Sequence, residues 1–388
     1  MLPLEGLRAI EFCNIAAGPF CGSLLSDLGV DVIKVEKPEG DDLRYWPPIT
    51  NGYSENFASL NRNKRSIALD LKSGKDRAIA FDLCASADIV IENNRPGVMD
   101  RLGLGYAAIA EKNPAVVYCS ISAFGQSGPS AQEGGFDLTI QAVSGVMSVT
   151  GEPNRPPVKC GVPVSDFAAG LYGAYGIAAA LLRAKSTGKG EHVDISMLGA
   201  TLGISALQTS EYFGTGRNSE PIGSRHPRNA PYQAFRARDG YVAMAAGNNK
   251  LWQSVCSALD RADLAAHEDF ATPTLRAKNQ LQLAEILEDD FKDRTVAELL
   301  ALLNKAGVPC GPINSFADAV RHPQVQHNGW VQDIELPGGV KTRTFGSPFV
   351  LGGEQIPVRG NPPALNADAD DILEELGSLR RGTKQARG

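Results

Sequence analysis

Strand-like and helical patterns alternate along the first 125 residues of the chain. The strand-like runs lie at 6–13, 30–36, 64–71, 88–93 and 115–125, and the helical patterns lie at 16–29, 72–87 and 107–113. Such alternation predicts an α/β fold with a mostly parallel sheet, because each helix returns the chain to the same end of the sheet. Ligands of these sheets bind at the carboxyl ends of the strands.

A single acid, Asp166, stands at the head of the apolar segment PVSDFAAGLYGAYGIAAALLRA (163–184). The segment is rich in Gly and Ala, and its uncharged run is shorter than the ~20 apolar residues of a membrane span, so it predicts a buried helix. Asp is a preferred N-cap, although Ser165 would cap the helix equally well. A helix N-terminus also favours an ionised carboxylate, which in an apolar site is a potential nucleophile.

The second half of the chain predicts a separate, smaller domain. The segment TGRNSEPIGSRHPRNAP is polar and broken by Gly and Pro, which is typical of a boundary. A hairpin is expected to turn at Asp239 and Gly240, and a Pro-rich, extended tail is expected to end in a helix. The expected ranges are 1–214 for a large domain completed by 330–388, 215–329 for a linker and small α+β domain, 248–259, 274–292 and 295–306 for its helices, and 367–377 for the terminal helix.

Composition excludes several classes of partner. The net charge is −6 and the basic residues are scattered, which argues against nucleic acid. The N-terminus has no signal-peptide pattern, so we expect a cytoplasmic protein with no membrane partner. Seven cysteines without CxxC spacing and five dispersed histidines predict reduced core thiols and no metal site.

The sequence also disfavours a dinucleotide-binding site and a serine-hydrolase site. Glu36 ends the second strand, but NIAAGPFCG lacks the glycine pattern of a dinucleotide turn, and no G-x-S-x-G is present. Basic residues instead recur beside turn residues in NRNKRS (61–66), at Lys72, in ENNRPG (92–97) and at Arg101. They could meet a phosphorylated ligand or form solvated faces.

Motifs along nearly the whole chain carry a family resemblance. They are AGPFCGSLLSDLGVDVIKVEKP (17–38), NRNKRSIALDLK (61–72), ENNRPGVMDRLGLGY (92–106), SISAFGQSGP (120–129), GFDLTIQAVSGVM (135–147), VPVSDFAAGLYGAYGIAAALL (162–182), TGKGEHVDISM (187–197), PYQAFRARDGYVAMAAGNN (231–249) and GVPCGPINS (307–315). With these motifs the chain resembles the class III CoA-transferases, which include formyl-CoA and carnitine CoA-transferases and α-methylacyl-CoA racemases. The resemblance implies a Rossmann-like large domain built from both ends of the chain, a small middle domain, and a homodimer of two interlocked rings.

The resemblance also implies a mechanism and a set of site residues. Asp166 would be the nucleophile that attacks an acyl-CoA thioester, and CoA would pass through an aspartyl thioester to a free carboxylic acid, with no tightly bound cofactor. The residues implied in CoA binding are Ala16, Ala17, Lys37, Leu69, Lys72, Asn93, Asn94 and Arg101.

Departures from relatives within this resemblance narrow the reaction. Formyl-CoA transferase has Gln where this chain has Ala16, and AAGNNK lacks its glycine-rich loop, which argues against a formyl or oxalyl substrate. Racemases carry a His where Phe136 stands before Asp137, and a Glu where Asn248 stands. Because racemisation needs acid and base groups on both faces of the substrate, we favour transfer and keep the 2-methylacyl-CoA racemase as the alternative. Asp137 is a secondary site candidate; its other role would be a structural hydrogen bond.

Three segments suggest the acyl group. SRHPRNAPYQAF (224–235), AAGNN and PQVQHNG (323–329) look most like the succinate–hydroxymethylglutarate CoA-transferases, which predicts a dicarboxylic donor such as succinyl-CoA. Arg225, His226 and Arg228 could bind the far carboxylate or could belong to a solvated linker, and Asn248 is a further candidate substrate residue. A second alternative is a non-catalytic acyl-CoA-binding subunit of a hetero-oligomer.

Overall fold

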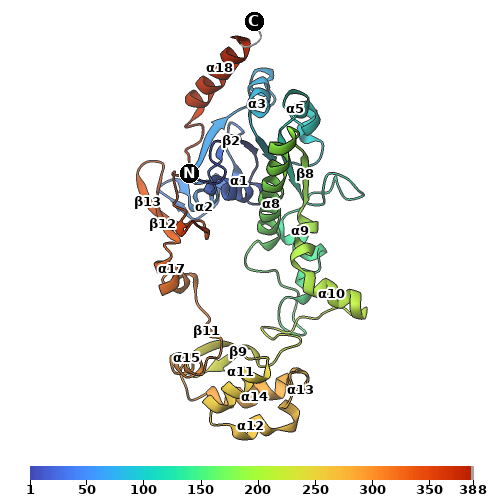
Figure 1. Cartoon of the computed structure of the whole chain (residues 1–388), viewed down its shortest axis with the longest axis vertical. Helices are drawn as coiled ribbons and strands as arrows, with labels where there is room; N and C mark the ends of the chain where they lie inside the picture. The colour runs from blue at the N-terminus through green and yellow to red at the C-terminus, as the bar shows by residue number, and fades with distance from the viewer. Residues whose placement is uncertain (386–388) are drawn as a thin grey trace. The chain divides into compact units, whose positions relative to one another are not determined.

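The computed structural model describes residues 1–385 and divides into two compact units (Figure 1). Unit 1 comprises Met1–Val146, Lys159–Arg217 and the described part of Pro323–Gly388, and unit 2 comprises Met147–Val158 and Asn218–His322. Unit 2 thus begins and ends a few residues away from the expected 215 and 329, and it includes a short excursion near residue 150 that the sequence pattern does not show.

Unit 1 is built on a parallel sheet of six strands in the order β5-β2-β1-β6-β7-β8. The strands are β1 (Arg8–Phe12), β2 (Asp31–Glu36), β5 (Lys64–Ala68), β6 (Ile89–Glu92), β7 (Val117–Ser122) and β8 (His192–Ser196). All five pairings between neighbours are parallel, which confirms the predicted α/β fold. The carboxyl ends of the six strands therefore share one edge.

Helices cover both faces of this sheet. Alternate residues of β1 enter different cores, with Ala9 in one and Ile10 in the other. The first face packs against α1 (Ala17–Asp27), α8 (Val164–Thr187) and α9 (Met197–Ile204), and the second against α3 (Gly74–Ser86), α5 (Tyr106–Lys112) and α18 (Ala369–Gln385). Helix α18 closes the second core with Ile372 and Leu376, so the C-terminal part of the chain completes unit 1.

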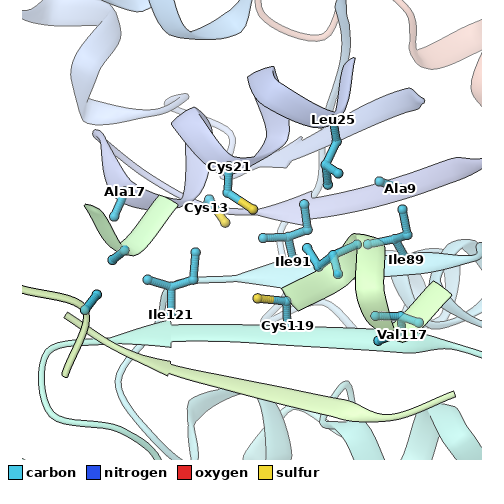
Figure 2. Close-up of a cluster of buried hydrophobic side chains, with 14 of the residues drawn as sticks. Ala9, Cys13, Ala17, Cys21, Leu25, Ile89, Ile91, Val117, Cys119 and Ile121 are labelled. Carbon is cyan, nitrogen blue, oxygen red and sulfur yellow. The ribbon is translucent and has the colours of Figure 1, made fainter. Parts of the chain in front are cut away.

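Helix α8 is a core helix, although it is long and apolar enough by composition to cross a membrane. It packs against α1 and β7, and Ala169 and Ile177 are fully buried in the first core. Figure 2 shows this core between α1 and the sheet, with Cys21 of α1 and Cys119 of β7 inside it. A hydrogen bond with Cys119 and burial raise the pKa of the Cys21 thiol, which suits an unreactive core residue.

The rest of unit 1 is peripheral to the sheet. It contains η1 (Asp42–Tyr45), β3 (Ile49–Thr50), β4 (Tyr53–Ser54), α2 (Glu55–Asn61), α4 (Val98–Arg101), α6 (Asp137–Val143), α10 (Ala206–Thr215), α17 (Pro323–His327), β12 (Val331–Leu336), β13 (Val340–Phe345), β14 (Val350–Leu351) and β15 (Glu354–Gln355); α7 (Val146–Val149) leads into unit 2. The expected extended tail thus folds back as the β12–β13 hairpin. Helices α9 and α10 meet at Ser205, which interrupts the single helix that the pattern suggests.

Unit 2 pairs a small antiparallel sheet, in the order β11-β10-β9, with several helices. Its elements are β9 (Tyr232–Ala237), β10 (Gly240–Ala245), β11 (Cys310–Pro312), α11 (Asn249–Ala258), α12 (Ala262–Ala266), η2 (Glu268–Phe270), α13 (Pro273–Lys278), α14 (Gln280–Phe291), α15 (Val296–Lys305) and α16 (Phe316–Ala319). The β9–β10 hairpin turns where predicted, whereas the helix expected over 274–292 is broken at Asn279 into α13 and α14.

Candidate active site

A cavity of about 240 Å³ lies in unit 1 at the carboxyl edge of the sheet. It is lined by Asn14, Ile15, Ala16, Ala17, Asn93, Asn94, Arg95, Pro96, Ile121, Ser122, Ala123, Glu133, Gly134, Gly135, Phe136, Asp166 and Met197. These residues end or follow β1, β6 and β7, precede α6, or stand at the start of α1, α8 and α9. The cavity therefore occupies the place where parallel sheets bind ligands.

Two glycines bring α8 close to α1 and so carry Asp166 to this cavity. A Cβ on Gly170 would stand 2.8 Å from the carbonyl oxygen of Ala17, and one on Gly173 would stand 3.1 Å from the Sγ of Cys21. Neither position has space for a larger side chain. The small residues behind Asp166 are therefore explained by the close approach of the two helices.

The carboxylate of Asp166 lies partly buried on the cavity wall. Burial raises its pKa to about 7, with a further contribution from the negative charge of Asp137. No hydrogen bond from residues 1–385 reaches this carboxylate. The sequence predicts that the helix N-terminus keeps this carboxylate ionised, but burial and the Asp137 charge favour its protonated form instead. Without a partner among the described residues, the carboxylate is available to a ligand.

Neither of the two residues expected to cap α8 does so. The helix begins at Val164 after Pro163, which offers no side-chain cap, and Asp166 is already its third residue. The Ser165 Oγ is buried and has no hydrogen-bond partner in the described part of the chain. The cap comes from α6, where Asp137 Oδ1 accepts the backbone N–H of Ser165 at 3.0 Å.

The turn between β1 and α1 holds a strained backbone beside the cavity. Ile15 has φ of 65°, a left-handed conformation that is unfavourable for a β-branched residue. Its N–H donates to Asp41 Oδ1 at 3.1 Å, and Lys34 Nζ donates to the carbonyl of Cys13 at 2.6 Å. Asn14 stands between Cys13 and Ile15 in this turn. The Asn93 side chain accepts the N–H of Asn14 and donates to the Asn14 carbonyl, each at 2.9 Å.

Buried charges support this turn from below. The side chains of Lys34, Glu11, Lys64 and Asp41 are fully buried. Lys34 pairs with Glu11 at 3.1 Å and Asp41 at 2.9 Å, and Lys64 pairs with Glu11 at 2.8 Å. Burial opposes the charge of Lys34, but Glu11 and Asp41 outweigh it and raise the pKa of Lys34. Two cations and two anions thus balance, which a buried cluster requires.

Four of the eight residues expected to bind CoA line the cavity: Ala16, Ala17, Asn93 and Asn94. The other four lie outside the cavity lining, after β2, β5 and β6. Lys37 follows β2 and pairs with Asp42 at 2.6 Å, Leu69 follows β5 and is buried, and Lys72 and Arg101 are exposed. Since β5, β2, β1 and β6 are consecutive in the sheet, these positions follow one edge.

Arg95 is a cavity residue that the sequence reasoning did not select. It is exposed, and its guanidinium lies 2.8 Å from the position that a Cβ on Gly134 would occupy. Within residues 1–385 Arg95 makes no ion pair. The motif ENNRPG contains the signal, but nothing in the sequence separates Arg95 from the other cations beside turns.

The expected substrate residues fall in two places. Asp137 lies in unit 1 behind the cavity lining, and both of its oxygens accept hydrogen bonds, from Ser165 and from Gln141 Nε2. The others belong to unit 2. Arg225 Nε donates to the carbonyl of Ile222, His226 Nδ1 accepts the N–H groups of Arg228 and Asn229, and Asn248 Oδ1 caps α11 by accepting the N–H of Leu251 at 2.8 Å.

Comparison with known families now identifies the fold and its chemistry. The family model for CoA-transferase family III matches residues 4–369. The chain belongs to CoA-transferase family III. This confirms the resemblance drawn from the motifs and makes the protein a class III CoA-transferase.

Named relatives of this CoA-transferase act on short diacids. The succinyl-CoA:glutarate CoA-transferase of Homo sapiens is 38% identical over 96% of this chain and 86% of its own length. The acetyl-CoA:oxalate CoA-transferase of Acetobacter aceti is 39% identical over 96% of each. Because the oxalate enzyme is as similar as the glutarate enzyme, the relatives give no support to the argument against an oxalyl group.

The fold agrees with a crystal structure of the same family. A CAIB/BAIF family protein from Brucella suis superimposes with a TM-score of 0.87 and 39% identity, covering 97% of this chain and 99% of that one. The agreement confirms the α/β architecture of this CoA-transferase. Among residues 1–385, no group of three or more His, Cys, Asp or Glu side chains is placed to hold a metal ion.

Proposed function

We propose that the chain moves CoA from an acyl-CoA to a free carboxylic acid with Asp166 as the covalent nucleophile. The observation that carries this proposal is the Asp166 carboxylate itself. It faces the cavity, makes no hydrogen bond with residues 1–385, and has a pKa raised to about 7 by burial and Asp137. A carboxylate free of protein partners keeps its lone pairs for attack on a carbonyl carbon.

The reaction then proceeds through balanced exchanges. An Asp166 oxygen attacks the thioester carbonyl, the C–S bond breaks, and CoA leaves as a thiolate. The thiolate attacks the Asp166 carbonyl of the resulting mixed anhydride, which releases the donor acid and leaves an aspartyl-CoA thioester. The acceptor carboxylate attacks this thioester and expels CoA again. The thiolate finally attacks the acceptor's carbonyl, so that the new acyl-CoA leaves and Asp166 is restored.

The cavity supplies what these steps require. The N-terminus of α1 begins at Ala17, and the first N–H groups of a helix have no partner within it, which suits the oxyanion of each tetrahedral intermediate. The clamped turn at Ile15 sets the direction of that helix. Substrate that fills this small cavity would displace the water that could otherwise hydrolyse the anhydride.

The carboxyl edge of the sheet is the proposed path of CoA. Asn93, Asn94 and Arg95 lie at the cavity, and Lys37, Leu69, Lys72 and Arg101 continue along neighbouring strand ends. Lysine and arginine side chains at these ends suit the phosphates of CoA, and Leu69 suits an apolar part. Arg95 is the one lysine or arginine among the residues that line the cavity.

A dicarboxylic donor such as succinyl-CoA is proposed, because relatives named for glutarate and mesaconate take succinyl-CoA as the donor. The oxalate enzyme shares only a diacid acceptor with them, since its donor is acetyl-CoA. Arg225, His226, Arg228 and Asn248 are the proposed contacts for the far carboxylate. The racemase alternative is disfavoured by Phe136, a cavity-lining residue that accepts no proton and stands where racemases carry a His.

A cytoplasmic homodimer of interlocked rings is the proposed assembly. Helices α8 and α10 leave large apolar side chains uncovered, including Tyr175 at 74% and Phe213 at 81% exposure. Exposed large apolar side chains of this kind are typical of a protein interface. The chain also leaves unit 1 after Arg217 and returns only at Pro323, which gives the long connections that threading needs.

Mass spectrometry of the purified chain with succinyl-CoA tests the mechanism. We expect a covalent acyl or CoA adduct on Asp166, and none on the Asp166→Ala variant. A panel of CoA donors and diacid acceptors, run with Arg225→Ala and Arg228→Ala, should show raised KM for the preferred diacid. An active Asp166→Ala would overturn the mechanism. A chain inactive on every donor would instead favour a non-catalytic acyl-CoA-binding subunit.

A further inference from the structure

The N-terminus of the nucleophile's helix is held by a side chain from another helix. Asp137 is the first residue of α6, and its Oδ1 accepts the N–H of Ser165, the residue before Asp166, at 3.0 Å. In most helices the N-cap residue itself accepts a hydrogen bond from one of the first backbone N–H groups. Pro163 offers none, so α8 depends on α6 for this function.

Asp137 is itself fixed by a second pair of hydrogen bonds. Its Oδ2 accepts from Gln141 Nε2 at 2.7 Å, and Gln141 Oε1 accepts the N–H of Cys160 at 2.8 Å. Gln141 is fully buried, so this amide is well held. Both oxygens of Asp137 are therefore occupied by protein donors, and the residue stands outside the cavity lining.

We propose that Asp137 is a positioning residue for transfer: it caps α8 in place of Asp166, leaves the Asp166 carboxylate free to attack, and acts on that carboxylate with its negative charge. The proposal rests on the proposed role of Asp166. It replaces the expectation that Asp137 touches substrate, since its carboxylate is engaged with the protein.

The electrostatic surroundings point to Asp137 as the charge that matters. Burial and the Asp137 charge raise the pKa of Asp166 to about 7, in that order of size. Helix α9 carries no ionisable residue, and the cavity lining adds Arg95 and Glu133. The remaining ionisable residues of the elements packed on α8 lie outside the lining: Cys21 and Asp27 of α1, Tyr118 and Cys119 of β7, and His192 and Asp194 of β8.

The decisive experiment measures the rate of adduct formation on Asp166 from succinyl-CoA against pH by rapid-quench mass spectrometry. Wild type, Asp137→Asn, Asp137→Ala and Asp88→Asn are compared. Asp88 is the matched control, because its Oδ2 also accepts a backbone N–H, that of Arg8 at 2.9 Å, but it precedes β6 at the opposite edge of the sheet.

We expect Asp137→Asn to move the midpoint of the pH profile downward by about one pH unit, since a neighbouring like charge is removed. Asp137→Ala should move it in the same direction and also lower the plateau rate by about tenfold, because the start of α8 is no longer held. Asp88→Asn should leave the midpoint unchanged. If the amide of Asp137→Asn disturbs Gln141, the shift of the midpoint in Asp137→Ala still tests the effect of the Asp137 charge.

Different failures separate the two proposals. If adducts form on Asp166 but both Asp137 variants keep the wild-type midpoint, Asp137 is only a structural contact and the inference is wrong. If wild type forms no adduct on Asp166, or Asp166→Ala forms the same adduct, the proposed function fails instead.

Discussion

At the scale of single residues, ionisation of Asp166 makes it reactive and at the same time lowers the stability of the folded protein. Burial and the Asp137 charge raise its pKa from 3.8 to about 7, so the folded state holds a proton that the unfolded state has already released at pH 5 or 6. Stability linked to this group is therefore highest at acidic pH and falls as pH rises through the interval between those two values. The group is ready for attack only where it destabilises the fold.

This conflict predicts that Asp166→Asn stabilises the protein at neutral and alkaline pH. The amide has the same shape and carries no charge, so the gain at pH 8 has an upper limit of about 4 kcal/mol, the equivalent of a pKa raised from 3.8 to about 7. Thermal unfolding at pH 8 and pH 4 measures it. We expect a higher Tm for the variant at pH 8 and no difference at pH 4. If the variant and the wild type had the same Tm at pH 8 as well as at pH 4, the raised pKa of Asp166 would be contradicted.

At the scale of elements, the approach of α8 to α1 places the nucleophile beside the proposed oxyanion site. Gly170 lies within α8 where a Cβ would meet the Ala17 carbonyl oxygen at 2.8 Å, and the backbone of α1 has no room to retreat because it packs on the sheet. Position 170 thus requires glycine for packing, although glycine weakens a helix.

Gly170→Ala is therefore expected to destabilise the protein by about 1–3 kcal/mol and to lower kcat, because overpacking at a backbone contact shifts the start of α8. Gly74→Ala is the matched control: it lies at the start of α3 with no atom within 4 Å of the added Cβ. There the better helix propensity of alanine should raise stability by up to about 1 kcal/mol. Denaturant unfolding measures both, and a stabilised Gly170→Ala would show that the helices are not in tight contact.

The sequence predicts those elements whose pattern is local. The strands β1, β2, β5, β6 and β7 and the crossover helices follow from alternation and periodicity, and the site edge follows from the parallel topology. Helix α6 has only seven residues and shows no clear period, so Asp137 could be noted only by its motif. Its cap on α8 joins residues 28 positions apart, and no local pattern records such a contact.

At the scale of the whole molecule, the chain brings distant segments into one unit. Glu375 of α18 pairs with Arg8 of β1 at 2.7 Å and with Arg65 of β5 at 2.9 Å, although more than 300 residues separate them. Periodicity predicts the terminal helix but not its partner strands, because the ion pairs depend on the strand order. The position of Arg95 in the cavity is likewise not predictable from a local pattern, because it depends on the loop that carries Gly134.

The proposed assembly of interlocked rings predicts a dimer that cannot separate while folded, with the uncovered apolar side chains of α8 and α10 as its proposed contacts. Light scattering should give about 82 kDa, twice the 41.2 kDa of one chain. Because interlocked rings part only when a chain unfolds, tagged and untagged dimers mixed at micromolar concentration should not exchange subunits over days, yet should exchange after unfolding and refolding. A dimer joined only through the surface near Tyr175 and Phe213 would exchange without unfolding, and a mass near 41.2 kDa would show that this surface has no partner.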